Sequence, residues 1–198
     1  KYNIPEDAFV ACFCGRIGKE KGIDHLIELF SKTTNDNMYL MVIGNGPYRE
    51  QFEQVAKDCG IDHRVIFTGA VPHEELAPYY ACCDAYATSS LSEMYSISML
   101  EAQASGLPVI QRLDPDNIDQ IKEGINGYLF ETEERFSEIV HMLANRTDEE
   151  RAIAKKKVRD SVADRNSLGI AKYLMDLYLL AIERRRAGIR PTRLRNGE

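Results

Sequence analysis

Two kinds of segment alternate along the chain. Short apolar runs rich in strand-forming residues predict strands, and amphipathic stretches with a helical spacing of apolar residues follow most of them. The predicted strands cover residues 8–14, 38–43, 64–68, 85–88, 108–110 and 128–130. The predicted helices cover residues 22–31, 47–59, 74–83, 96–105, 117–123, 133–145, 148–160 and 167–186.

The predicted strands are apolar along their whole length rather than at alternate positions. This pattern is typical of a parallel sheet with both faces covered. Strands that alternate with helices form βαβ units, so we expect an α/β fold: a parallel sheet with helices on both faces and a helical C-terminus. Ligands bind such sheets at the carboxyl ends of the strands, so the loops there are the places to look for a site.

Composition indicates a globular protein and limits its partners. The chain has 198 residues, of which 44% are hydrophobic and 28% charged. Residues 184–195 carry six arginines and no acid, so the net charge of −6 leaves −12 on the remainder. An acidic body argues against nucleic acid as the main partner. We expect one domain over residues 1–186 and a flexible basic tail at 187–198.

Cysteine usage and hydropathy predict a cytoplasmic protein. The five cysteines, at positions 12, 14, 59, 82 and 83, lack C-x-x-C spacing, which favours buried, reduced thiols over a zinc site or disulfides. No stretch approaches the roughly 18 apolar residues of a membrane span. Residues 1–7 lack the apolar core of a signal peptide, and we interpret them as a linker or the trailing edge of a preceding domain.

The loop after the first predicted strand is rich in glycine and charge. Residues 15–22 read GRIGKEKG, and Arg16 and Lys21 are suited to an anionic ligand at a helix start. Lys21 lies near the positive end of the helix dipole, which is unfavourable unless an anion such as a diphosphate is bound. The alternative is a solvated loop in which Glu20 and Asp24 balance Lys21.

Glycines also mark two other strand ends. Residues 44–47 read GNGP and residues 69–72 read GAVP. Gly44 and Gly46 let the backbone approach a ligand closely, although many strand-to-helix turns carry two glycines. Together the two turns predict the walls of a flat slot.

Two acids flank the start of the helix predicted over 96–105. Ser96 is a suitable N-cap, so Glu93 precedes the helix and Glu101 lies on its second turn. Helical side chains lean toward the N-terminus, so both carboxylates can address one ligand, and a carboxylate accepts hydrogen bonds from a sugar diol. The alternatives are an exposed helix glutamate at Glu101 and a dipole-stabilised acid at Glu93.

Several segments together resemble the C-terminal domain of family 4 of the glycosyltransferases. They are GRIGKEKGIDHLIELF, MVIGNGP, VIFTGAV, the E-x7-E pair followed by EAQASGLPVI, and EGINGYLF, between about residues 9 and 130. The resemblance implies the Rossmann-like donor-binding half of the two-domain GT-B architecture. It also implies transfer of a hexose from a nucleotide sugar with retained anomeric configuration and without a metal or other cofactor.

The resemblance implies a role for each candidate residue. Arg16 and Lys21 would hold the donor diphosphate and stabilise the departing nucleotide. Glu93 would contact the transferred sugar, and Glu101 would bind the ribose hydroxyls. The other expected donor-binding positions flank the base or lie in the loops beside the donor: Gly15, Gly44, Gly46, Val71, Tyr95, Ser96 and Ile97.

Two departures from the family pattern bear on activity. The family often has Gly-Phe-Gly after the first acid, where this chain has Met94-Tyr95-Ser96, so donor geometry or identity is open. We also expect these residues to lack the family's N-terminal domain, which supplies acceptor contacts and often an active-site histidine. We therefore expect this chain alone to bind its donor weakly and turn over poorly.

Within the family, residues 90–130 look closest to bacterial glucosyltransferases that act on diacylglycerol lipids. This similarity favours UDP-glucose as donor, a lipid or glycan acceptor, and work at the inner face of the membrane. The arginine-rich tail fits peripheral contact with anionic lipid, at about 1 kcal/mol per residue. A solvated tail is the alternative.

Three other functions stay open at this point. One is a nucleotide-sugar epimerase of the same two-domain plan, and another is a catalytically inactive regulatory domain. The third, an NAD-dependent oxidoreductase, needs a glycine-rich turn and an acid about 20 residues on, and the charges of GRIGKEKG would crowd that turn.

Overall fold

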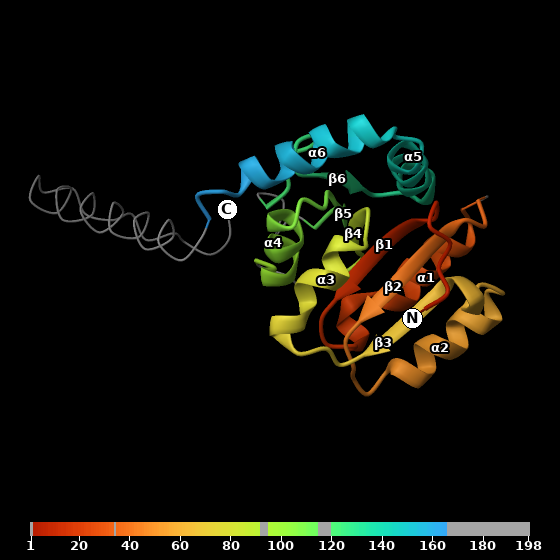
Figure 1. Cartoon of the computed structure of the whole chain (residues 1–198). Helices are drawn as coiled ribbons and strands as arrows, with labels where there is room; N and C mark the ends of the chain where they lie inside the picture. Colours follow the sequence, from red (N-terminus) through yellow and green to blue (C-terminus); the bar gives the residue numbers. More distant parts are fainter. Residues whose placement is uncertain (1, 34, 92–94, 115–119, 166–198) are drawn as a thin grey trace, which may run out of the picture. The chain divides into compact units, whose positions relative to one another are not determined.

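The computed structural model describes residues 2–33, 35–91, 95–114 and 120–165 (Figure 1). Lys1–Ser161 form one compact unit and Val162–Glu198 a second, and every helix and strand named below belongs to the first. The helix predicted over 167–186, the predicted domain end at residue 186 and the tail at 187–198 lie outside the described residues.

Six strands form one parallel sheet in the order β3-β2-β1-β4-β5-β6. The order reverses between β1 and β4, so the switch point, where such sheets bind ligands, lies at the carboxyl ends of these two strands. The predicted parallel α/β sheet is confirmed, strand by strand. The bounds are β1 (Phe9–Cys14), β2 (Met38–Ile43), β3 (Val65–Gly69), β4 (Ala85–Thr88), β5 (Val109–Arg112) and β6 (Gly127–Phe130).

Helices cover both faces of this sheet, as predicted. α1 contacts α2 and α5, while α4 contacts α6, and Figure 1 shows the two groups on opposite sides of the strands. The bounds are α1 (Ile23–Ser31), α2 (Arg49–Asp58), α3 (Leu76–Ala81), α4 (Ile97–Ala104), α5 (Glu133–Ala144) and α6 (Asp148–Ser161). Short 3-10 turns lie at Lys19–Lys21, Asp62–Arg64 and His73–Glu75.

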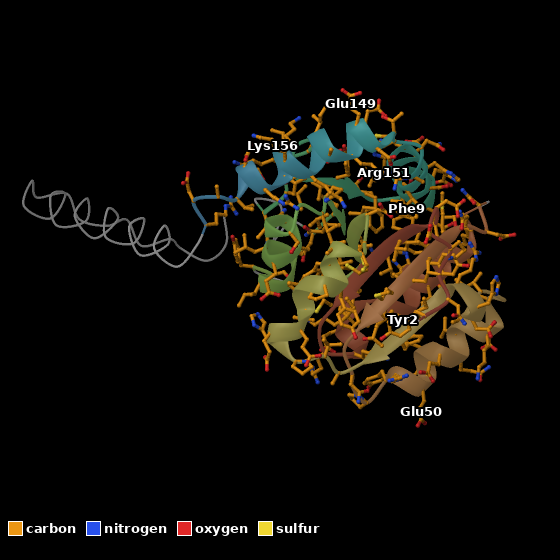
Figure 2. The ribbon with its side chains drawn as sticks, viewed as in Figure 1. Tyr2, Phe9, Glu50, Glu149, Arg151 and Lys156 are labelled. Atoms are coloured by element: carbon orange, nitrogen blue, oxygen red, sulfur yellow. The ribbon has the colours of Figure 1, made fainter. Side chains whose placement is uncertain are left out.

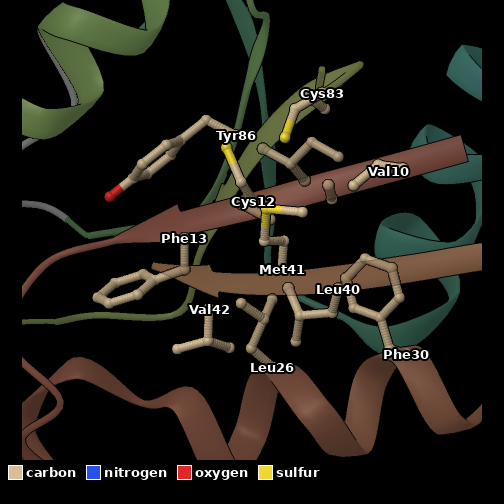
Figure 3. Packing of buried hydrophobic residues seen from close by; sticks show 14 of the residues in the cluster. Val10, Cys12, Phe13, Leu26, Phe30, Leu40, Met41, Val42, Cys83 and Tyr86 are labelled. Carbon is tan, nitrogen blue, oxygen red and sulfur yellow. The ribbon is translucent and has the colours of Figure 1, made fainter. Parts of the chain in front are cut away.

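The core explains why the strands are apolar throughout. In Figure 3, Leu26 and Phe30 point from α1 toward the β2 side chains of Leu40 and Val42. Phe30 also packs edge to face on Phe136 of α5, with ring centroids 5.4 Å apart. Burial on both faces fixes the strands, so their carboxyl ends present loops on a rigid support.

Arg151 of α6, labelled in Figure 2, attaches that helix to the sheet. Its Nη1 lies 3.0 Å from Asp84 Oδ1, and Asp84 Oδ2 accepts a 2.9 Å hydrogen bond from the backbone of Val10. The same guanidinium donates to the carbonyls of Arg146 and Ala144 near the end of α5. These bonds lie near the amino ends of β1 and β4, opposite the edge where a ligand is expected.

One predicted helix is wrong where it can be compared. Residues 121–123 of the predicted 117–123 helix are not helical, and 115–119 lie outside the described residues. The backbone N–H of Lys122 donates to Asn126 Oδ1 at 2.7 Å, and the Gln120 side chain bonds both backbone groups of Ser96. The Asn126 side chain thus takes the Lys122 N–H, a backbone group that a helix would use.

Two smaller expectations are also corrected. α2 begins at Arg49, because Pro47 and Tyr48 form a turn before it. Cys82 is exposed at the end of α3, so the prediction of a buried thiol is wrong there. Burial is confirmed for Cys12, Cys14 and Cys83, while Cys59 is half-buried.

Candidate functional site

The loop after β1 is fixed against the GNGP turn. Gly15 N–H donates to Ile43 O at 2.9 Å, and the N–H of fully buried Ile17 donates to Asn45 O at 3.0 Å. A side chain on Gly44 or Gly46 would collide with this loop, at Gly15 O and Ile17 O respectively. Loop packing therefore accounts for both glycines, and their contact with a donor stays a prediction.

The 3-10 turn Lys19–Lys21 lies against the end of β4. Gly22 has φ +61°, and a Cβ on it would stand 2.7 Å from Ser89 O. On the other side of Lys21, Ser90 Oγ donates to Glu20 O at 3.3 Å. Half-buried Lys21 is thus carried to the carboxyl end of β4, at the switch point of the sheet.

Arg16 lies on the outside of the same loop. Its side chain is 67% exposed, and Nη2 is 2.5 Å from Glu20 Oε1. Glu20's backbone hydrogen bond, with help from Arg16, lowers the pKa of the Glu20 carboxyl. Glu20, which the alternative interpretation pairs with Lys21, is therefore bonded to Arg16. Exposed ion pairs are weak, so this one contributes little to holding the Arg16 side chain in place.

Ser96 is the N-cap of α4, as predicted. Its Oγ accepts from Met99 N at 3.4 Å, while its own N–H donates to Gln120 Oε1 at 2.9 Å. The amide of Ser96 is thus already bonded to Gln120. Tyr95 and Ile97 beside the cap are 47% and 69% exposed. Glu93 lies outside the described residues.

Glu101 joins α4 to the loop after β3. Its side chain is 27% exposed, and His73 Nε2 lies 2.7 Å from Oε1. Tyr80 of α3 donates to Oε2 at 3.4 Å. The hydrogen bond to Glu101 raises the pKa of His73 above its ordinary value. Glu101 therefore faces this loop rather than open solvent, unlike the exposed glutamate of the alternative interpretation.

Two tyrosines connect Glu101 and α4 to the end of β1. Tyr86 OH donates to Cys14 O at 3.2 Å and lies 3.0 Å from Ser98 Oγ of α4. Burial raises the pKa of Cys14, with a smaller contribution from the charge of Glu101 and an opposing one from a hydrogen bond with Tyr80. The Glu101 carboxylate thus lies close to Cys14, two residues before Arg16.

The two predicted turns lie side by side. Gly44 N–H donates to Gly69 O at 3.0 Å, so the ends of β2 and β3 meet there. Val71 follows, half-buried against the core, and His73 reaches Glu101 two residues later. The structure therefore brings the GNGP turn, the Val71 loop and Glu101 into one row along the carboxyl edge.

Sequence reasoning missed His73 and Tyr80, the two partners of Glu101. The available signal was position: His73 lies between the GAVP turn and the helix predicted to begin at Glu74. Tyr80 is buried in α3 and shows no such signal in the pattern. Neither contact follows from spacing, since both cross between elements that only tertiary packing brings together.

The described residues contain neither a metal-binding group nor a membrane-spanning helix. In that part of the chain, no three His, Cys, Asp or Glu side chains gather as a metal-binding group. The helices there are too short or too polar to cross a bilayer.

Comparison with known proteins decides the family. Residues 1–160 match the sequence profile described as glycosyl transferases group 1. The chain belongs to this family. The predicted resemblance is therefore confirmed over the whole sheet of this glycosyltransferase domain and the helices that cover it.

Three known proteins illustrate the similarity. An alpha-monoglucosyldiacylglycerol synthase from Acholeplasma laidlawii is 30% identical over 148 residues, covering 73% of this chain and 37% of that protein. A GDP-mannose-dependent alpha-mannosyltransferase from Corynebacterium glutamicum is 35% identical over 119 residues, covering 60% and 27%. The crystal structure of Anabaena Alr3699/HepE with UDP-glucose has a TM-score of 0.74 at 20% identity, covering 88% and 49%.

These matches differ in what they establish. The HepE structure shows the fold, since its sequence is only 20% identical. The chain spans 37% and 27% of the lengths of the two sequence relatives, which are therefore much longer proteins. The donors in their names, and the UDP-glucose in the HepE crystal, belong to those proteins.

Proposed function

We propose that this glycosyltransferase domain binds the nucleotide-sugar donor of a retaining hexosyltransferase. The observation that carries the proposal is that the turn Lys19–Lys21 lies against the end of β4, while the Glu101 side chain lies near the end of β1. A cation and an acid separated by 80 positions in the sequence therefore come from elements beside the switch point of one parallel sheet. A nucleotide sugar needs both kinds of group, for its diphosphate and its hydroxyls.

The diphosphate belongs at the loop after β1. α1 begins at Ile23, directly after Lys21 and Gly22, so the positive end of its dipole points toward the same loop. Arg16 supplies a second cation once its exposed pair with Glu20 opens. In transfer, negative charge builds on the departing phosphate, and these cations stabilise it as a metal ion would elsewhere.

The ribose belongs at Glu101. Its carboxylate can accept hydrogen bonds from two ribose hydroxyls. The nucleotide base would then lie next to the ribose, against the turns at residues 44–47 and 69–72. Glu93 would meet the transferred sugar, and the exposed Tyr95 and Ile97 are further candidates for donor contact.

UDP-glucose is the favoured donor. The relatives include an alpha-monoglucosyldiacylglycerol synthase, and HepE shares the fold and was crystallised with UDP-glucose. The mannosyltransferase from C. glutamicum makes GDP-mannose the competing donor. We further propose that the acceptor is a lipid or a glycan and that an N-terminal domain binds it. The enzyme would then act in the cytoplasm, at the membrane.

A donor panel tests this function. The melting temperature of the 198-residue chain is measured with UDP-glucose, GDP-mannose and NAD, each at the same concentration. Ligand at about 100 times its Kd adds about 2.7 kcal/mol of stability, which is easily detected. We expect UDP-glucose to give the largest rise and NAD none. A rise with NAD alone, or with no nucleotide sugar, would contradict the proposal.

A further inference from the structure

We propose that His73 competes with the donor ribose for the carboxylate of Glu101 and so makes nucleotide-sugar affinity depend on pH. This inference rests on the proposed ribose-binding role of Glu101. It adds to that role a residue which the sequence pattern did not indicate. His73 is the first residue of the turn His73–Glu75, in the loop between β3 and α3.

The geometry places His73 on the oxygen that a ligand needs. Oε2 of Glu101 is on the Tyr80 side, and Tyr80 is 2% exposed in the core. Oε1 bonds His73 Nε2 at 2.7 Å, the shorter of the two contacts. A ribose diol that bonds Glu101 in bidentate fashion requires Oε1, so one of its hydroxyls competes there with the imidazole.

Displacement of His73 is structurally easy. Its side chain is 80% exposed, whereas that of Glu101 is 27% exposed. The imidazole thus moves into solvent without opening the core, and the carboxylate stays in place. Glu101 is kept in position by its place in α4 and by Tyr80, so removal of His73 leaves the acid ready for a ligand.

The ionisable groups around His73, among the described residues, are its partner Glu101 and three neighbours. Glu101 comes from α4, Glu74 from the turn of His73 itself, Tyr80 from α3, and Cys14 from β1. Burial raises the pKa values of Tyr80 and Cys14, so both stay protonated while His73 titrates. The carboxylates of Glu101 and, more weakly, Glu74 favour the charged imidazole.

The direction of the pH effect follows from the raised pKa of His73. Below that pKa the imidazolium bonds Glu101 strongly, and the donor must break this ion pair. Between the ordinary pKa of a solvated imidazole and the raised pKa of the pair, the displaced His73 also gives up its proton. Above the raised pKa the imidazole is neutral and competes weakly. Donor affinity therefore falls as pH falls through the pKa of His73. The loss is at most about tenfold for each pH unit between the pKa of His73 bonded to Glu101 and that of the free imidazole.

Calorimetry of UDP-glucose binding tests the competition across about pH 5.5–8.5, the range in which histidine titrates. The phosphates of UDP-glucose are diesters and keep their charge throughout. The variants are His73→Ala and His73→Gln, with His63→Gln as the control, since His63 is an exposed histidine on the turn Asp62–Arg64. Repeating the titration in buffers of different ionisation enthalpy measures the proton released on binding.

We expect wild type and His63→Gln to lose affinity as pH falls through the raised pKa of His73, and to release a proton on binding within that range but not below it. Both His73 variants should bind more tightly than wild type at low pH, with a flat profile and no proton release. Affinity lost equally at every pH in His73→Ala would make His73 a direct donor contact and overturn the competition, as would an unchanged profile.

A Glu101→Gln titration separates this inference from the proposed function. If Glu101→Gln loses UDP-glucose binding while the His73 variants keep the wild-type pH profile, only the competition is wrong. If Glu101→Gln binds UDP-glucose as wild type does, Glu101 does not bind the ribose, and His73 cannot compete with the ribose for it.

Discussion

Replacing Lys21 by alanine is expected to abolish the rise in melting temperature that UDP gives this domain. Lys21 is half-buried, and the residues on either side of it lie against the end of β4, so its backbone lies beside the switch point. Hydrogen bonds to charged groups contribute about 1.5–3 kcal/mol each, and losing one weakens binding about 10- to 100-fold. At about ten times the wild-type Kd, the stabilisation by UDP then falls from about 1.4 kcal/mol to between about 0.1 and 0.4 kcal/mol.

Lys19→Ala is the matched control for Lys21→Ala. Lys19 is in the same 3-10 turn and carries the same charge, but it is exposed. Thermal melts with and without UDP should show a normal rise for Lys19→Ala and none for Lys21→Ala. A normal rise in Lys21→Ala would remove this residue from the phosphate site, and equal losses in both variants would indicate only a general charge effect.

Glu101→Gln is expected to weaken UDP binding by about 10- to 100-fold while leaving pyrophosphate binding unchanged. The amide keeps the shape of the carboxylate but loses its charge and one acceptor, which costs about 1.5–3 kcal/mol at a charge-assisted bond. Pyrophosphate has no ribose, so its contacts with Arg16 and Lys21 remain. Calorimetric titration of both ligands measures the difference.

Glu74→Gln controls for loss of a negative charge in this region, because Glu74 is exposed on the neighbouring turn. It should leave both affinities near wild type. Equal loss of UDP and pyrophosphate in Glu101→Gln would show that Glu101 does not bind the ribose. Tighter binding of both would show instead that its charge only repels the diphosphate.

Local pattern was enough to predict the fold. Runs such as those of β1 and β2 are apolar at every position, and the packing of Leu26 on Leu40 and Val42 shows why both faces had to be covered. A helix boundary could be predicted where a single residue determines it, as the N-cap Ser96 does for the start of α4. The parallel sheet then placed the loops at one edge without further information.

The parts that could not be predicted depend on contacts between distant segments. The Gln120 side chain bonds the backbone of Ser96, 24 positions away, and residues 121–123 are not helical as their pattern suggested. Gly44 and Gly46 were predicted to face a ligand, and they are required by the backbone of the loop after β1. The His73–Glu101 pair likewise crosses from one loop to another helix, where periodicity carries no information.

We propose that the loop after β1 and the start of α4 bind one nucleotide diphosphate between them, and a crystal structure of this chain with UDP would show whether they do. We expect phosphate oxygens about 3 Å from the Lys21 ammonium, ribose hydroxyls at the same distance from Glu101, and His73 withdrawn from Oε1. UDP bound elsewhere on the domain, with the His73–Glu101 contact intact, would contradict it.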